Sequence, residues 1–143
     1  MPGRDGDVFV APVALPGRPL FLYGAGHIGR ALAPHLVALQ FDLHWVDIAE
    51  DRFPDTIPAG ARRVVATDPT VIAAHAPGDA FHLVITHNHA LDEAICHRVL
   101  SGDGFARLGL IGSATKAARF RSRLGNAGVD EAALDRLVCP VGL

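Results

Sequence analysis

Several residue types are scarce in this 143-residue chain, and each scarcity excludes a class of protein. The two cysteines, Cys96 and Cys139, are too few for a disulfide scaffold or a four-thiolate zinc site. No apolar run approaches the ~18 residues of a membrane-spanning helix, and the first residues lack a basic segment followed by a hydrophobic one. A net charge of −2 lacks the basic excess typical of nucleic-acid binding. We therefore expect a soluble, cytoplasmic protein that binds neither nucleic acid nor membrane.

The residues that are present indicate one folded domain. Half of them are hydrophobic and 20% are charged, which excludes a disordered tail. Residues 1–18 mix glycine and proline with a short extended stretch, so we interpret them as a linker or edge extension before a domain at 19–143. Among the 13 lysines and arginines the only lysine is Lys116, so the position of this ammonium group is informative.

Apolar runs alternate with helical patterns from Pro19 onward. The pattern predicts a first helix that carries Ile28, Leu32, Leu36 and Leu39, although Pro34 interrupts it. Nearly all-apolar strands that alternate with helices predict an α/β fold, a Rossmann-like, doubly wound, mostly parallel sheet in three layers. We expect strands at 19–23, 42–46, 63–66, 81–86, 107–111 and 137–139, later helices at 69–75, 90–100, 114–124 and 131–134, and an irregular segment at 48–62.

A glycine motif follows the first expected strand, at the edge where such sheets bind ligands. A G-x-G-x-x-G sequence between a strand and a helix, followed by a second strand that ends in an acid, is typical of dinucleotide binding. Gly24 permits the tight turn, Gly26 lets a pyrophosphate approach the backbone, and Gly29 permits close helix–strand packing. His27 lies in the helix N-terminus that would bind the phosphate, and Asp47 would accept hydrogen bonds from a ribose. The alternative is that the glycines only shape the turn.

A polar cluster follows the fourth expected strand, namely Thr86, His87, Asn88 and His89, with Asp92 in the next helical turn. We expect at least one of the two histidines to contact a ligand. His87 and His89 resemble a metal pair with Asp92 as a third ligand, but their spacing is unusual for one. The alternative is that Asn88 or His89 caps the helix and an imidazole bonds locally. We therefore assign no metal.

A second expected anion site follows the fifth strand. Gly112 and Ser113 lead into a helix, and Ser113 is a natural N-cap. Lys116 lies in the first turn, where it opposes the helix dipole, and Arg119 lies three residues further on. An anion between these two side chains would explain their placement, and a solvated basic face is the alternative. On this interpretation Lys116→Ala weakens anion binding and slightly stabilises the protein.

Three stretches in combination are specific to one family: LYGAGHIGRAL at 22–32, THNHALD at 86–92 and GLIGSATKAARF at 109–120. Together with CPVGL at 139–143 they resemble the XdhC/CoxI family, the accessory proteins of xanthine dehydrogenase and related molybdenum hydroxylases. The resemblance covers the chain from about residue 19 to the end. It implies the Rossmann-like C-terminal domain of such a protein, and the family's N-terminal CoxI-type domain is absent from this sequence.

The resemblance implies a cofactor-binding accessory domain rather than a turnover enzyme. Such proteins bind the molybdenum cofactor (molybdopterin) as cargo while its terminal sulfur is installed, and deliver it to the hydroxylase. The implied partners are a xanthine dehydrogenase-like hydroxylase and a cysteine desulfurase, with a homodimer left open. The alternative is an NAD(P)-binding oxidoreductase or a nucleotide-sensing domain. By the resemblance Gly24, Gly26 and Gly29 would hold a phosphate, and the rest of the crevice would be lined by Thr86, His87, His89, Gly112, Ser113 and Lys116.

Overall fold

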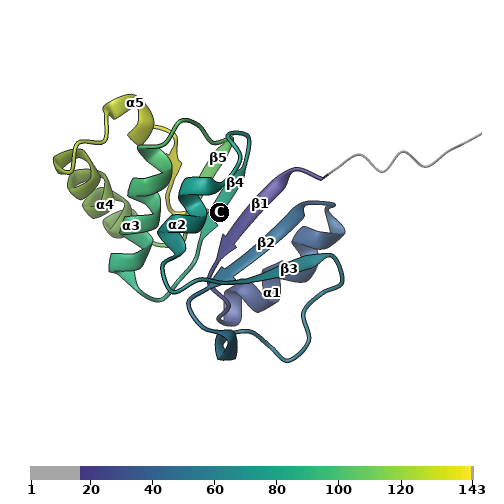
Figure 1. Ribbon diagram of the computed structural model, residues 1–143. Helices are drawn as coiled ribbons and strands as arrows, with labels where there is room; N and C mark the ends of the chain where they lie inside the picture. The colour runs from purple at the N-terminus through teal and green to yellow at the C-terminus, as the bar shows by residue number, and fades with distance from the viewer. Residues whose placement is uncertain (1–16, 143) are drawn as a thin grey trace, which may run out of the picture.

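The computed structural model describes residues 17–142, so residues 1–16 of the expected linker lie outside the described residues. Six parallel strands form one sheet in the order β3-β2-β1-β4-β5-β6 (Figure 1). Because the chain starts in the middle of the sheet and builds outward in both directions, the order is that of a Rossmann fold. The predicted fold class is confirmed, and the sheet is parallel throughout.

The elements follow the expected alternation of strands and helices. The strands are β1 (Pro19–Tyr23), β2 (Asp42–Asp47), β3 (Ala61–Val65), β4 (Phe81–Val84), β5 (Arg107–Leu110) and β6 (Leu137–Val138). The helices are α1 (His27–Ala38), the short 3-10 helix η1 (Glu50–Arg52), α2 (Pro69–His75), α3 (His89–Leu100), α4 (Ala114–Asn126) and α5 (Glu131–Leu134).

The structure differs from the expected elements mainly at their ends. β3 begins two residues before the expected strand and includes the last two residues of the segment expected to be irregular. That segment also contains η1. The strands β4 and β5 end earlier than expected. The first helix continues through Pro34, which is exposed. Proline has no amide hydrogen to donate to the carbonyl four residues earlier, that of Arg30. Because this carbonyl lies on the solvent side of the helix, the missing hydrogen bond does not break the helix.

Alternating residues of the central strand serve two cores, one on each face of the sheet. Leu20 and Leu22 belong to a cluster with Trp45 and α1, whereas Phe21 and Tyr23 belong to a cluster with residues of α2, α3, α4 and α5. Figure 1 accordingly shows α1 apart from the group of α3, α4 and α5. The three layers leave the carboxyl ends of all strands, and the N-termini of α1, α3 and α4, at one edge.

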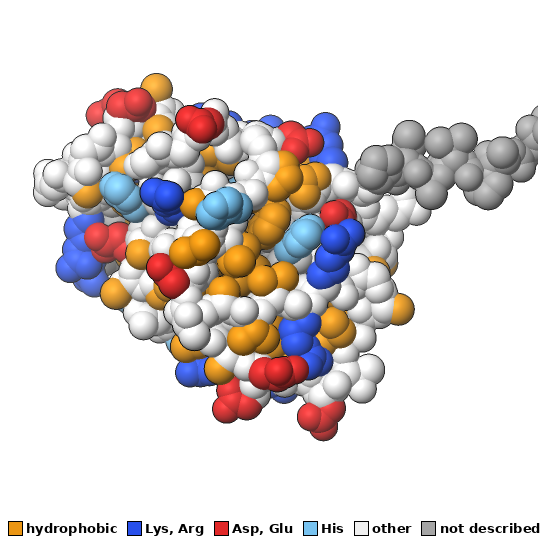
Figure 2. All heavy atoms as spheres, in the orientation of Figure 1, with side chains coloured by type: hydrophobic (Ala, Val, Ile, Leu, Met, Phe, Trp, Pro, Cys, Tyr) orange, Lys and Arg blue, Asp and Glu red, His pale blue; other side chains and the backbone are white. Residues whose placement is uncertain are grey.

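The surface carries charges of both signs. Figure 2 shows positive and negative side chains interspersed on one face, around apolar side chains near its middle. Within residues 17–142 no helix has the length and apolar content that crossing a membrane requires.

A hydrogen-bonded pair of polar rings lies inside the larger core. The Tyr23 hydroxyl is 3.0 Å from Nδ1 of His82, and the two rings stack with centroids 5.9 Å apart. Only 3% of His82 and none of Tyr23 is exposed. Burial disfavours the charged imidazolium, and it lowers the pKa of His82 from 6.5 to about 4.

We expect His82 to make the protein less stable as the pH falls from 6.5 to about 4. In this window the unfolded chain binds a proton at His82 that the folded chain does not, so protons favour unfolding. The full shift corresponds to roughly 3 kcal/mol. Urea unfolding of the wild type and of His82→Gln at pH 7 and pH 5 measures the effect. The two proteins share all other titratable groups, so the difference between their pH dependences belongs to His82. An equal loss of stability in both proteins would contradict it.

Candidate functional site

The glycine loop after β1 brings α1 close to the sheet. Gly24 has φ +120°, in the region that favours glycine, and its carbonyl accepts a 2.9 Å hydrogen bond from Nε1 of Trp45. A Cβ on Gly29 would lie 2.2 Å from that same carbonyl oxygen, so only glycine permits this contact between helix and loop. The N-terminus of α1 is thereby fixed at the carboxyl edge of the sheet, with no acidic side chain in its first turn.

Asp47, at the end of β2, is held by the backbone of the loops. Its two carboxylate oxygens accept hydrogen bonds from the amides of Ala25 and Ile48, each at 2.7 Å. The side chain therefore orders the glycine loop, and each oxygen keeps a further acceptor position. An acceptor role of Asp47 toward a ribose is expected from the sequence, and this role in ordering the loop is additional.

Two arginines that the sequence interpretation missed border the glycine loop. Arg30, on α1, donates from Nε to the Ala25 carbonyl at 3.0 Å and from Nη2 to the Arg52 carbonyl at 2.8 Å. It joins the glycine loop to η1. Both arginines line a hollow of about 350 Å³ together with Gly26 and His27. The only available signal was that Arg30 directly follows the motif.

The loop after β4 lies against the glycine loop. A Cβ on Gly26 would lie 2.6 Å from Cε1 and 3.0 Å from Nε2 of His87, so the imidazole lies where a side chain at this position would project. Asn88 caps α3, because its side-chain oxygen accepts hydrogen bonds from the amides of Ala90 and Leu91. His89 begins α3 and is exposed. The alternative in which Asn88 is a helix cap is therefore confirmed.

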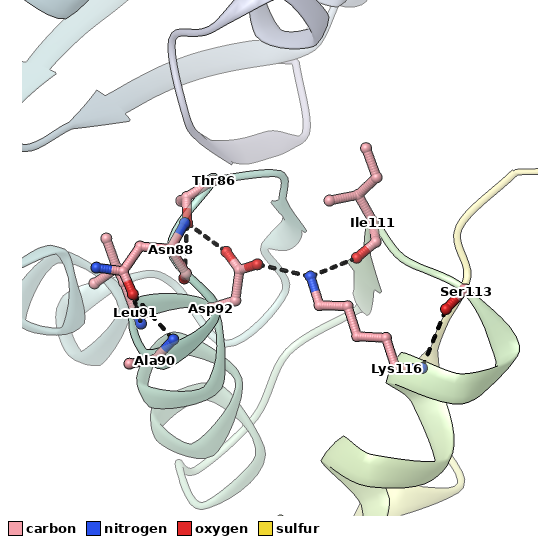
Figure 3. Close-up of polar contacts among 8 residues, drawn as sticks. All are labelled: Thr86, Asn88, Ala90, Leu91, Asp92, Ile111, Ser113 and Lys116. Carbon is pink, nitrogen blue, oxygen red and sulfur yellow. Dashed lines mark hydrogen bonds and ion pairs between the residues drawn. The ribbon is translucent and has the colours of Figure 1, made fainter.

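A buried ion pair joins the two connections that follow β4 and β5. Asp92 is fully buried, and its Oδ2 lies 2.9 Å from Nζ of Lys116, whose side chain is 11% exposed. The ammonium also donates to the Ile111 carbonyl at 2.9 Å, and the Thr86 hydroxyl donates to Oδ1 of Asp92 at 2.5 Å. Figure 3 shows Lys116 reaching from α4 across to α3, with Thr86 on the far side of Asp92.

This network changes the interpretation of two residues. Asp92 is engaged by Lys116 and Thr86, so it is not a third ligand beside the histidines, and within residues 17–142 no three potential metal ligands cluster. The ammonium of Lys116 is paired with Asp92 instead of standing beside Arg119, which is exposed. The expected stabilisation by Lys116→Ala therefore does not fit the structure.

The remaining expected residues lie at the same edge of the sheet. Ser113 caps α4 by accepting a 3.2 Å hydrogen bond from the Lys116 amide, as predicted. A Cβ on Gly112 would meet Cδ of Lys116 at 2.6 Å, so this glycine makes room for the buried lysine stem. The structure brings the glycine loop and His87 into contact, whereas Arg119 is exposed on α4.

Known proteins share the sequence pattern and the fold. A family model described as the XdhC Rossmann domain matches residues 20–143. The Escherichia coli K12 protein YqeB, which is described as uncharacterized, is 34% identical over 129 residues, or 86% of this chain and 23% of YqeB. A Bacillus halodurans crystal structure described as a xanthine dehydrogenase has a TM-score of 0.74 and 22% identity, over 90% of this chain and 38% of that chain. This chain spans well under half the length of either protein.

We expect Lys116→Ala to lower the free energy of unfolding by about 3 kcal/mol, because it leaves the buried Asp92 carboxylate without its cation. Urea unfolding curves measure this. Arg119→Ala, on the exposed face of the same helix, is the matched control and should change stability by less than ~0.5 kcal/mol. Replacing both charges, as Asp92→Asn with Lys116→Met, should recover most of the loss. A Lys116→Ala protein as stable as the wild type would contradict the structural role.

Proposed function

Since the chain belongs to the XdhC family of Rossmann domains, we propose that it binds the molybdenum cofactor at the carboxyl edge of its sheet. Family membership implies an accessory role toward xanthine dehydrogenase. The finer proposal is that the chain holds the cofactor while its terminal sulfur is installed and then delivers it to the apo-hydroxylase. A cysteine desulfurase would supply the sulfur. Both YqeB and the structural relative are longer than this chain, so other segments of such proteins would contribute to the whole activity.

The observation that carries the proposal is the open N-terminus of α1 above the glycine loop. Gly26, which has no side chain, is the N-cap, and no side chain accepts a hydrogen bond from the first turn at this cap. The free N–H groups and the helix dipole therefore suit an anion. Molybdopterin carries a phosphate, and its dinucleotide form carries a pyrophosphate, so the residues present fit the group.

The charge for this phosphate comes from the α1 side of the crevice. Arg30 and Arg52 line the hollow beside Gly26, together with the carboxylates of Asp47 and Asp51, whereas the ammonium of Lys116 is neutralised by Asp92. We assign Lys116 to positioning the two loops, not to direct contact with the phosphate. The other proposed contacts are Gly24, His27, Gly29, Asp47, Thr86, His87, His89, Gly112 and Ser113, with Arg119 at the rim.

When bound, the molybdenum cofactor supplies the redox centre on which the hydroxylase depends. The residues of this chain bind and orient it. The Asn88 cap and the Asp92–Lys116 pair hold the loop after β4 in place beside the glycine loop.

A nicotinamide dinucleotide is the second candidate ligand, because Asp47 ends β2 at the position that favours a ribose diol. Its two carboxylate oxygens are each engaged by one backbone amide, which leaves acceptor capacity for a diol. This reading predicts NAD binding and, for an oxidoreductase, turnover.

We expect Gly26→Val to abolish binding of the molybdenum cofactor while leaving the fold intact. The added side chain enters the space beside the α1 N-terminus, where its Cβ meets the flexible imidazole of His87. Equilibrium titration of the wild type and the variant with molybdenum cofactor released from a molybdoenzyme measures this, with circular dichroism as a check of folding. NAD is titrated in parallel. Unchanged affinity in a folded variant would remove the α1 N-terminus from the site, and binding of NAD alone would favour the second candidate.

A further inference from the structure

A second cavity lies at the amino edge of the sheet, opposite to the edge that carries the glycine loop. Its volume is about 420 Å³, and it opens between the last turns of α2 and α3, because both helices run back from the carboxyl edge. His82, the second residue of β4, is the strand residue that lines it. None of its lining residues borders the hollow beside Gly26, so a ligand in this cavity would be separate from the proposed cofactor site.

His82 presents a ring nitrogen without a partner to this cavity. The residue is 3% exposed, and its Nδ1 lies 3.0 Å from the Tyr23 hydroxyl, whereas Nε2 has no hydrogen-bond partner in the described part of the chain. Within residues 17–142, the only side-chain nitrogen or oxygen that is fully enclosed and lacks a partner is Nε of Arg63. Nε2 of His82 is therefore not enclosed, and it is accessible from the cavity that this residue lines. Buried polar groups are nearly always paired, so this nitrogen marks a place for a ligand or a water molecule.

The hydrogen bond with Tyr23 determines which ring nitrogen of His82 carries the proton. The Tyr23 hydroxyl is fully buried, and Nδ1 of His82 is its partner. Because a buried hydroxyl that donates to nothing costs free energy, Tyr23 donates to Nδ1, and the proton of the neutral ring lies on Nε2. Burial lowers the pKa of His82 to about 4, so the ring stays neutral at pH 7. The floor of the cavity is thus a fixed N–H donor, which suits a carboxylate oxygen.

The rim of the cavity carries one charge of each sign. Arg98, in the last turn of α3, and Asp103, in the connection to β5, both line the cavity and are exposed. Between Gly17 and Gly142 neither side chain makes an ion pair or a hydrogen bond. A carboxylate between Arg98 and His82 would use both donors, and an ammonium would pair with Asp103 and with the partial negative charge at the end of α3. A ligand with a single charge would instead face a lining charge of its own sign.

We propose that this cavity is a second binding site, which takes an α-amino acid with a short apolar side chain. Its carboxylate would accept hydrogen bonds from Nε2 of His82 and from Arg98, and its ammonium would pair with Asp103. Its side chain would lie against the apolar part of the lining, which is formed by Ala73, Ala76 and Val99. The inference goes beyond the proposed function, since it requires neither the molybdenum cofactor nor NAD.

The test titrates the full chain with three probes of similar shape. L-valine carries both charged groups, isovalerate lacks the ammonium, and isobutylamine lacks the carboxylate. We expect L-valine to bind at least about tenfold more tightly than either analogue, because each analogue loses one charge-assisted contact. Nitrogen NMR of the histidine rings should show the bound carboxylate as a shift of the Nε2 signal of His82, with the same midpoint as the binding curve.

Surface variants test the two charged contacts without disturbing the buried Tyr23–His82 pair. Arg98→Gln and Asp103→Asn should each weaken L-valine binding about tenfold, since each removes the charge opposite to one group of the ligand. Arg107→Gln, which changes an exposed arginine on β5 that does not line the cavity, is the matched control and should preserve the affinity.

Tight binding of L-valine that shifts the His82 signal and is weakened in both variants supports the inference. No binding of L-valine, or equal binding of the three probes, overturns it, because Nε2 of His82 then meets only water. Binding that leaves the His82 signal or either variant's affinity unchanged also overturns it, since the amino acid is then bound elsewhere or differently. All of these results leave the cofactor site untouched, because the two sites share no residue.

Discussion

The buried pair of Asp92 and Lys116 is the interaction on which the candidate site depends. It joins the start of α3 to the start of α4. Its hydrogen bonds with Thr86 and with the Ile111 carbonyl also hold the loop between β4 and α3 and the loop between β5 and α4. Removing a charge from water is costly, so a fully buried carboxylate requires its cation close by. The pair therefore fixes the geometry of the edge where ligands bind in this fold.

This pairing determines where positive charge is available. A first-turn lysine opposes the helix dipole, and here that cost is offset by the carboxylate it meets. What remains for an anion is the N-terminus of α1, whose adjoining hollow is lined by Arg30 and Arg52 and also by Asp47 and Asp51. Arg30 also ties the glycine loop to η1. The crevice is consequently asymmetric: its α1 side suits a phosphate, and its α3 and α4 side is held together by internal contacts.

Local signals in the sequence predicted much of this structure. The bounds of β1, α2 and α5 and the caps at Ser113 and Asn88 follow from nearby residues, because caps and turns are short-range. The Asp92–Lys116 pair could not be predicted in this way. Its residues lie 24 positions apart on different helices, and the direction of a long lysine side chain depends on what the fold places within its reach. The contact of His87 with Gly26 likewise depends on two loops that meet only in the folded sheet.

The central claim is that the α1 N-terminus, and not Lys116, receives the phosphate of the cofactor. The most direct measurement is an NMR titration of backbone amides with molybdenum cofactor. We expect the largest shift changes at Gly26, His27 and Gly29, and we expect them to saturate together with cofactor binding. Shift changes that are largest at Ser113 and Lys116, with the glycine loop unaffected, would contradict it.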